Sequence, residues 1–207
     1  MLMKIIAPSF CVRDSINGSE MLKKIEAAGR ICYKSEGNAK EGSAEKFVGA
    51  LIASKHESVL EHEKVSVLII CDRGISHEWV RHRIASYSQE STRYCNYAND
   101  KFGNELTFIK PCFWEEGSTL FELWKSQMQA IEITYFDMLK AGASPQEARS
   151  ILPNSLKTEV LVTMNIRAWR HFFKLRTDTA AHPQIREIAL PLLKHFKDIM
   201  PVLFDDL

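Results

Sequence analysis

The strongest periodic signal in the sequence lies between Thr119 and Lys140, where apolar residues return every three or four positions. That spacing puts them along one stripe of an α-helix, so the sequence predicts a long amphipathic helix here. Gly142 follows and can end the helix in a left-handed conformation. The predicted stripe consists of Leu120, Leu123, Trp124, Gln127, Met128, Ile131, Tyr135, Met138 and Leu139.

Shorter helices are predicted where the same period appears between polar boundaries. Ser43 stands as an N-cap before one of them. Ser144 precedes a short helix that has Pro145 at its first position and Glu147 at its third. The longer predicted helices span residues 19–33, 43–55, 75–83, 168–175 and 184–197.

Three strands are predicted. Residues 63–70 and 156–164 alternate with a period of two, which is typical of half-buried strands, and residues 106–109 form a short strand ended by Pro111. Helices and strands follow one another without a repeating strand–helix–strand rhythm. The pattern therefore predicts the α+β class: a single domain over residues 1–207, with a mixed or antiparallel sheet flanked by helices.

Composition narrows the function classes. The 207 residues are 45% hydrophobic and 26% charged, as in an ordinary globular domain. The net charge of +1 disfavours a nucleic-acid coat or a polybasic membrane surface, and no apolar run approaches the ~20 residues that span a bilayer. The five cysteines include no Cys-x-x-Cys pair, which favours reduced thiols. We therefore expect a cytoplasmic protein with neither a nucleic acid nor a membrane as partner.

No metal site is predicted. His77, Glu78 and His82 resemble the zinc-binding His-Glu-x-x-His motif, but the second histidine comes one residue too late. A separation of five turns two helical side chains about 140° apart, whereas the motif needs the separation of four that puts both on one face.

Candidate chemistry concentrates between Arg81 and Tyr94. Arg81, His82 and Arg83 come first, a hydroxyl-rich stretch follows, and an Arg-Tyr pair ends the segment. Arginine forks bind phosphates and planar carbonyl-bearing rings in bidentate fashion, and tyrosine faces can stack on such rings. The segment suits a nucleotide or another phosphorylated heterocycle. A basic helix end followed by a polar loop explains the composition equally well.

A second group of polar residues lies nearer the C-terminus: Asn165, Arg167, His171 and Arg176, with Arg149 ahead of them. Arg167 and His171 are four positions apart, so a helix places them on one face. Lone arginines are usually solvated, so each position taken singly favours a surface role.

The motifs together resemble the flavin-dependent thymidylate synthases. The signature of that family is Arg-His-Arg, seven intervening residues and Ser, which reads here as Arg81-His82-Arg83 with Ser91. The resemblance covers roughly residues 20–198 and includes further similar segments at 55–58, 61–62, 148–153 and 165–176.

The resemblance implies an α+β homotetramer, with sites shared between subunits, that converts dUMP to dTMP. It implies FAD as cofactor, methylenetetrahydrofolate as carbon donor and NAD(P)H as reductant. The implied cofactor contacts are Ser58, Arg81, His82, Arg83, Gln89, Asn165, Ile166, Arg167 and His171. The implied dUMP contacts are Glu78, Trp79, Val80, Arg81, Gln89, Glu90, Ser91, Thr92, Arg93, Arg149 and Arg176.

Arg176 is the residue that the resemblance implies to be catalytic. A guanidinium held against O2 and N3 of uracil stabilises negative charge as it develops on the ring. Glu78 stands where many members of the family carry Gln, and Ala180 where some carry His. Two alternatives stay open: a nucleotide-binding regulatory module without turnover, and an RNA-binding protein, which the low net charge disfavours.

Overall fold

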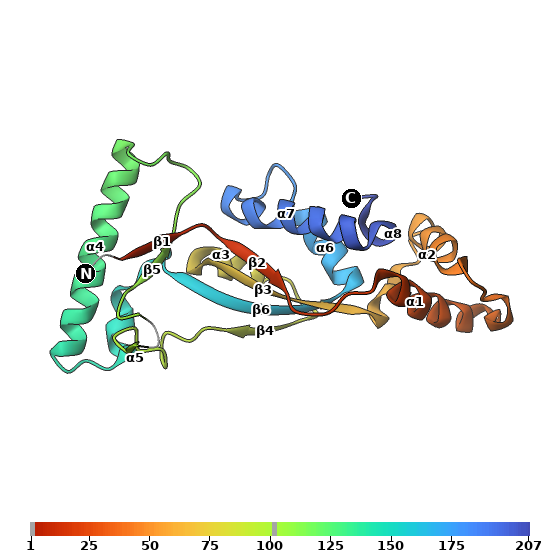
Figure 1. Ribbon diagram of the computed structural model, residues 1–207, viewed down its shortest axis with the longest axis horizontal. Helices are drawn as coiled ribbons and strands as arrows, with labels where there is room; N and C mark the ends of the chain where they lie inside the picture. The colour runs from red at the N-terminus through yellow and green to blue at the C-terminus, as the bar shows by residue number, and fades with distance from the viewer. Residues whose placement is uncertain (1–2, 101–102) are drawn as a thin grey trace. The chain divides into compact units, whose positions relative to one another are not determined.

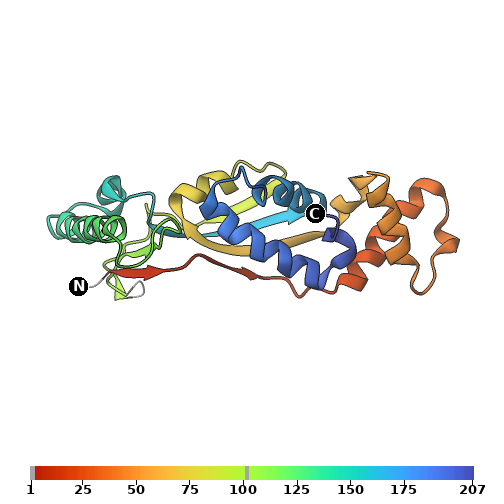
Figure 2. The same cartoon turned by 90° about the horizontal axis from the view of Figure 1, so that it is seen from above.

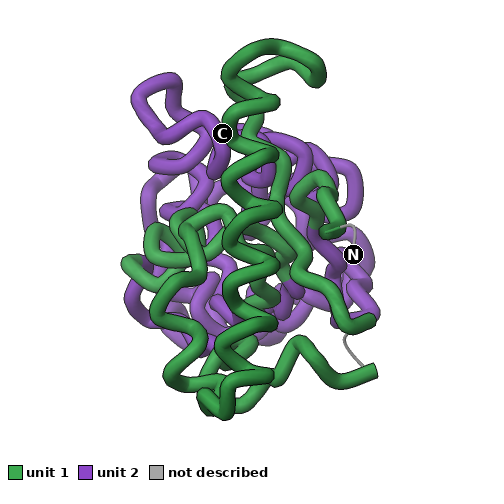
Figure 3. The backbone as a smooth tube through the Cα atoms, turned by 90° about the vertical axis from the view of Figure 1, so that its left-hand side faces the viewer, with its two compact units in different colours: residues 1–9, 69–81, 88–160 green, residues 10–68, 82–87, 161–207 purple. Residues whose placement is uncertain are grey.

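The computed structural model describes residues 3–100 and 103–207. It divides into two compact units: unit 1 comprises residues 1–9, 69–81 and 88–160, and unit 2 comprises residues 10–68, 82–87 and 161–207 (Figure 3). Helices and strands are interspersed along the chain without regular alternation, and the strands pair in both parallel and antiparallel fashion, so the predicted α+β class is confirmed. The single domain over 1–207 stays a prediction. Within the described ranges, no helix is long and apolar enough to cross a membrane.

The larger sheet has four strands in the order β2 (Ser9–Val12), β3 (Lys64–Asp72), β6 (Lys157–Asn165) and β4 (Ala85–Gln89) (Figure 1). β3 and β6 run antiparallel, because each strand begins where the other ends. Ile166 N donates to Glu63 O (2.9 Å) at one end, and Arg73 N donates to Leu156 O (3.0 Å) at the other. Side chains along both strands alternate between buried and partly exposed, as the predicted period of two requires.

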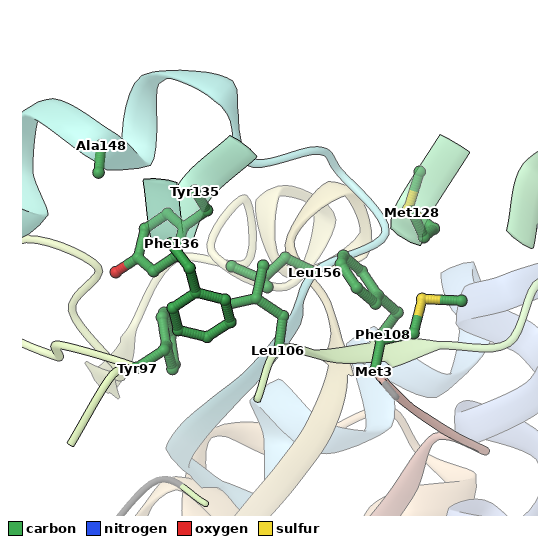
Figure 4. Packing of buried hydrophobic residues seen from close by; sticks show 9 residues of the cluster. All are labelled: Met3, Tyr97, Leu106, Phe108, Met128, Tyr135, Phe136, Ala148 and Leu156. Atoms are coloured by element: carbon green, nitrogen blue, oxygen red, sulfur yellow. The ribbon is translucent and has the colours of Figure 1, made fainter. Parts of the chain in front are cut away.

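Unit 1 contains a hydrophobic core beside α4 (Thr119–Lys140). Two short strands, β1 (Lys4–Ile6) and β5 (Thr107–Ile109), pair in parallel with Ile5 opposite Phe108. The other helical elements of this unit are α3 (Arg73–Trp79), α5 (Pro145–Ala148) and the 3₁₀ helix η4 (Arg149–Ile151). Figure 4 shows the buried cluster, which consists of Met3, Tyr97, Leu106, Phe108, Met128, Tyr135, Phe136, Ala148 and Leu156.

The bounds predicted for α4 are confirmed, but its predicted apolar stripe is wrong in part. Leu120 and Leu123, in the first turns, are 55% and 62% exposed. Glu132 is instead buried at 2% exposure, and its carboxylate accepts a 2.8 Å hydrogen bond from Leu106 N. A buried backbone N–H needs an acceptor. The residue just before β5 therefore determines that Glu132 is buried, whereas the period of the helix left Glu132 off the apolar stripe.

Unit 2 packs α6 (Ile166–Arg176) and α7 (Pro183–Ile199) on one face of its part of the sheet (Figure 2). Trp169 fastens α6 to β3, because its Nε1 donates to Val65 O at 3.0 Å. Around Trp169 the fully buried rings of Phe172, Phe173 and Phe196 pack with it. The remaining elements of the unit are α1 (Gly18–Tyr33), η1 (Glu36–Asn38), α2 (Ser43–Ala53), η2 (Glu57–His62) and α8 (Pro201–Phe204).

The helix predicted over 75–83 is displaced toward the N-terminus. α3 begins at Arg73, since Asp72 Oδ1 accepts from Ile75 N at 2.7 Å and caps it. It ends at Trp79, so the Arg-His-Arg triplet at 81–83 follows the helix and does not lie on one of its faces.

The predicted N-cap of α2 is also wrong. Gly42, with a φ of +74°, precedes the helix, and Ser43 is its first residue. The Ser43 hydroxyl donates to Glu26 Oε1 at 2.7 Å. A glycine there adopts the left-handed backbone at no steric cost.

Candidate active site

A cavity of about 430 Å³ lies in unit 2, within the size range typical of small-molecule sites. Four segments that are distant in sequence form its wall: η2, the turn before β4, the β6–α6 junction and the middle of α6. The lining residues are Glu57, Glu61, His82, Arg83, Ile84, Asn165, Arg167, Ala168, His171 and Lys174. Five of the nine residues predicted to contact the cofactor are among them.

The junction of β6 and α6 positions one side of this cavity. Asn165 ends β6 and caps α6, because its Oδ1 accepts from Ala168 N at 2.8 Å. With the helix start fixed in this way, Arg167, His171 and Lys174 follow at intervals of four and three along one face. The predicted common face of Arg167 and His171 is therefore confirmed.

His82 is the most enclosed polar residue of the cavity. It is 7% exposed, and its ring meets the Phe172 ring edge-on with centroids 4.9 Å apart. Arg176 Nε donates to His82 Nε2 at 2.9 Å. Burial, together with the nearby charges of Arg176 and His171, lowers the pKa of His82 to about 4. The imidazole is therefore neutral at pH 7.

Charges around the cavity are predominantly cationic. Arg83, Arg167 and Lys174 are exposed on its wall. Glu61 pairs with Arg167 at 2.6 Å, and Glu57 is held by buried Arg170 at 3.2 Å. The guanidinium groups can bind phosphate in bidentate fashion, so the cavity suits a phosphorylated ligand.

Ile84 has a strained backbone at the cavity wall. Its φ is +63°, in the left-handed region where a β-branched residue is an outlier. Its side chain is also 78% exposed. A conformation of this kind costs about 1–3 kcal/mol and is found mainly at functional sites.

Ser58 and Ile166 complete the unit 2 part of the predicted cofactor set. Ser58 is exposed and lines a neighbouring cavity of about 360 Å³, which shares Glu57 and Arg167 with the first. Ile166 is fully buried and its N–H donates to Glu63 O, so it offers no exposed surface to a ligand.

Gln89, predicted for both ligands, lies in unit 1 at the end of β4. Its Nε2 donates to Ser76 Oγ at 2.9 Å and to Thr158 Oγ1 at 3.2 Å. Ser76 belongs to α3, two residues before Glu78, so Gln89 and the predicted substrate residues that end α3 lie in one neighbourhood of unit 1.

Glu90 faces a different cavity of unit 1, of about 520 Å³. Its carboxylate accepts from Tyr97 Oη at 2.7 Å and pairs with Lys157 at 3.1 Å. The side chain is thus occupied by the protein itself. Its backbone is engaged as well, because Glu90 N donates to Glu159 O at 2.9 Å and Glu90 O accepts from Arg73 Nη1 at 3.3 Å.

Arg176, another predicted substrate residue, ends α6 in unit 2. The remaining ones occupy three places in unit 1: the end of α3 with the two residues after it, the segment after β4, and the first residue of η4. Trp79 and Thr92 are buried, so their side chains belong to the core. The exposed or partly exposed members are Glu78, Val80, Arg81, Ser91, Arg93 and Arg149. Their contacts to substrate stay a prediction, as do those of the cofactor set.

Five residues that line the cavity were not predicted from the sequence as cofactor or substrate contacts: Glu57, Glu61, Ile84, Ala168 and Lys174. The helical spacing that places Arg167 and His171 on one face also predicts Lys174 there, because Lys174 lies one turn further along the helix. Glu57, Glu61 and Ala168 lie in the segments 55–58, 61–62 and 165–176 that resemble the family, and Ile84 lies in the Arg81–Tyr94 segment, but none of the four was predicted to contact a ligand. Their place at the cavity depends on how η2 and the turn before β4 pack.

Sequence comparison gives a consistent family assignment. The family described as "Thymidylate synthase complementing protein" matches residues 16–202. The flavin-dependent thymidylate synthase of Pyrococcus furiosus is 38% identical over 167 residues, covering 79% of this chain and 68% of the relative. The enzyme of the same name from Geobacter sulfurreducens is 35% identical over 191 residues, covering 88% of this chain and 80% of the relative.

Structural comparison agrees. The UMP/dUMP methylase PolB from Streptomyces cacaoi, in its crystal structure with 5-Br dUMP, superposes with a TM-score of 0.78 and 25% identity, covering 98% of this chain and 96% of PolB. The family match covers most of the chain, and the two relatives are more than 30% identical to it. This chain therefore belongs to the thymidylate synthase complementing protein family, which is the family of the flavin-dependent thymidylate synthases.

Proposed function

We propose that this protein is a flavin-dependent thymidylate synthase, which reductively methylates dUMP to dTMP with FAD as its cofactor. The observation that carries the proposal is the convergence of His82, Arg83, Asn165, Arg167 and His171 on one cavity. These residues come from segments that are distant in sequence, and each belongs to a motif of the family.

The residues present fit FAD. Arg83 and Arg167 offer guanidinium forks for the diphosphate, and Asn165 and His171 add side-chain hydrogen-bonding groups. The neighbouring cavity beside Ser58 shares Arg167 with the first, which suits an elongated ligand. Bound FAD supplies a hydride for reduction of the one-carbon unit.

Arg176 is the residue we assign to the chemical step. It ends α6, is half-buried, and stays protonated at any working pH. Donation from its guanidinium to O2 of uracil, beside N3, stabilises the negative charge that develops on the ring as C5 becomes nucleophilic. Arg93 and Arg149 are exposed cations, which we assign to the nucleotide phosphate. Glu78, Gln89 and Ser91 orient the base and sugar.

The remaining partners belong to the same proposal. Methylenetetrahydrofolate donates the carbon, and NAD(P)H supplies the electrons. The protein works in the cytoplasm as a homotetramer whose sites are shared between subunits. Family membership supports each of these points.

The direct test is a visible spectrum of the purified protein, followed by anaerobic addition of NAD(P)H. We expect a flavin spectrum that bleaches, and dTMP formation once dUMP and methylenetetrahydrofolate are added. A protein that binds dUMP and FAD but never forms dTMP would be the regulatory module. A colourless protein that stays colourless with added FAD, and binds RNA, would contradict the proposal altogether.

A further inference from the structure

His82 is held rigidly within unit 2. Its ring lies against the edge of Phe172 at 4.9 Å and near His171 at 6.2 Å between centroids. Its backbone carbonyl accepts a 2.7 Å hydrogen bond from Tyr87 Oη. The residue is 7% exposed, and these contacts hold the ring in one orientation, so its nitrogens point in defined directions.

One of these nitrogens contacts the proposed catalytic arginine. Arg176 Nε lies 2.9 Å from His82 Nε2. A guanidinium carries only donors, so Nε2 must be the acceptor and must lack a proton. His82 is therefore the neutral tautomer protonated on Nδ1. The lowered pKa of His82, about 4, agrees with this state.

The consequence for Arg176 is geometric. The guanidinium is planar, and its five N–H groups have fixed relative directions. An acceptor on Nε fixes the plane and, with it, the directions in which Nη1 and Nη2 donate. Arg176 is the last residue of α6 and is followed by a turn, so the helix alone constrains this long side chain weakly.

We propose that His82 is a positioning residue for Arg176: its neutral imidazole accepts from Nε and thereby aims the rest of the guanidinium at the uracil ring. This inference rests on the proposed function. In this role, the histidine of the Arg-His-Arg triplet affects the chemistry of the substrate indirectly, by orienting Arg176. Any contact of His82 with the cofactor is additional.

The activity test compares two isolated substitutions. His82→Gln can place an amide oxygen near the former Nε2 and keep the acceptor, whereas His82→Asn is one bond shorter and cannot. At saturating FAD, we expect His82→Asn to lower the saturated rate of dTMP formation roughly 10- to 100-fold, the range for a misplaced charge-stabilising donor, and His82→Gln to lower it clearly less. Equal losses in both variants would overturn the inference.

A double-mutant cycle separates positioning from a merely structural effect. In an Arg176→Lys background there is no Nε–H to position, so His82→Asn should cause little further loss of rate. An undiminished loss in that background would overturn the proposal, because it would show that His82 acts independently of Arg176. Thermal unfolding of each variant checks that the fold is retained.

A spectroscopic test does not depend on turnover. In protein labelled with ¹⁵N-histidine, the His82 signal should show protonated Nδ1 and unprotonated Nε2 throughout the neutral pH range. The signal should change in Arg176→Lys. A wild-type His82 protonated on Nε2 would refute the inference whatever the enzyme does. Absence of dTMP formation by a wild type that shows the expected tautomer would refute only the proposed function.

Discussion

The buried Arg170 should be a principal determinant of stability in unit 2. Its side chain is 1% exposed, and both terminal nitrogens bond Asp206, at 2.7 and 2.6 Å. Nη1 also donates to Leu203 O, and Nε donates to Glu57 Oε1 at 3.2 Å. The network therefore ties α6 to the C-terminal segment and to η2.

The perturbation we choose is Arg170→Met, which keeps the apolar stem and removes every donor. Breaking a buried pair by removing one partner costs about 3–5 kcal/mol, because the other charge is left uncompensated. Asp206 is 49% exposed and can be rehydrated, so we expect the lower end, about 3 kcal/mol. For a chain of this size that corresponds to a fall in Tm of about 6–12 °C.

The matched control is Arg167→Met, one turn earlier on the same helix. Arg167 also bonds a glutamate of η2, Glu61, at 2.6 Å, but the two side chains are 51% and 42% exposed. An exposed pair contributes at most about 1 kcal/mol. Both variants are unfolded by heat and by urea at one fixed protein concentration, since the Tm of any protein that assembles depends on concentration. Equal shifts in the two variants would refute the reasoning from burial.

Three further predictions concern the site. Ile84→Asn should raise the Tm of the FAD-free protein by about 2–4 °C, because asparagine tolerates the positive φ that strains isoleucine. Thermal unfolding with Ile84→Val as the control measures this shift, and an unchanged or lower Tm in Ile84→Asn would contradict backbone strain at Ile84. Arg149→Ala should mainly raise the dUMP concentration needed for half-maximal rate, whereas Arg176→Lys should mainly lower the saturated rate; steady-state kinetics decide, and the reverse pattern contradicts the assigned roles. Because the folded pKa of His82, about 4, lies below its ordinary value of 6.5, the unfolded chain takes up the proton first. Stability should then be full above pH 6.5 and fall by about 1–3 kcal/mol as the pH drops toward 4. Urea titrations of wild type and His82→Gln measure this loss, which should shrink in the variant.

The local pattern of apolar and polar residues was enough to predict the structure wherever a single helix or strand buries one regular face. The alternating valines of β3 and β6 are fully buried, as their period predicts, and the bounds of α4 agree with its capping and terminating residues. Arg167 and His171 share a helix face for the same reason. In each case the positions involved lie within a few residues of one another, so the geometry of the backbone alone relates them.

Tertiary contacts decided the rest. β4 reads Ala-Ser-Tyr-Ser-Gln, a short and mostly polar segment that was not predicted as a strand, and it becomes one because β6 lies beside it. Likewise, nothing in the sequence near Arg170 indicates that it is buried while Arg167 is exposed. That difference depends on carboxylates brought from η2 and from the C-terminal segment.

The sequence by itself determined the family motifs, most element types and the residues able to bind a nucleotide. Only the tertiary structure decided which of those residues face a common cavity, and that His82 accepts a hydrogen bond from Arg176. The physical reason is range. Helix and strand periods act between neighbours in sequence, whereas burial, tautomer and pKa depend on whatever the fold brings within a few ångströms.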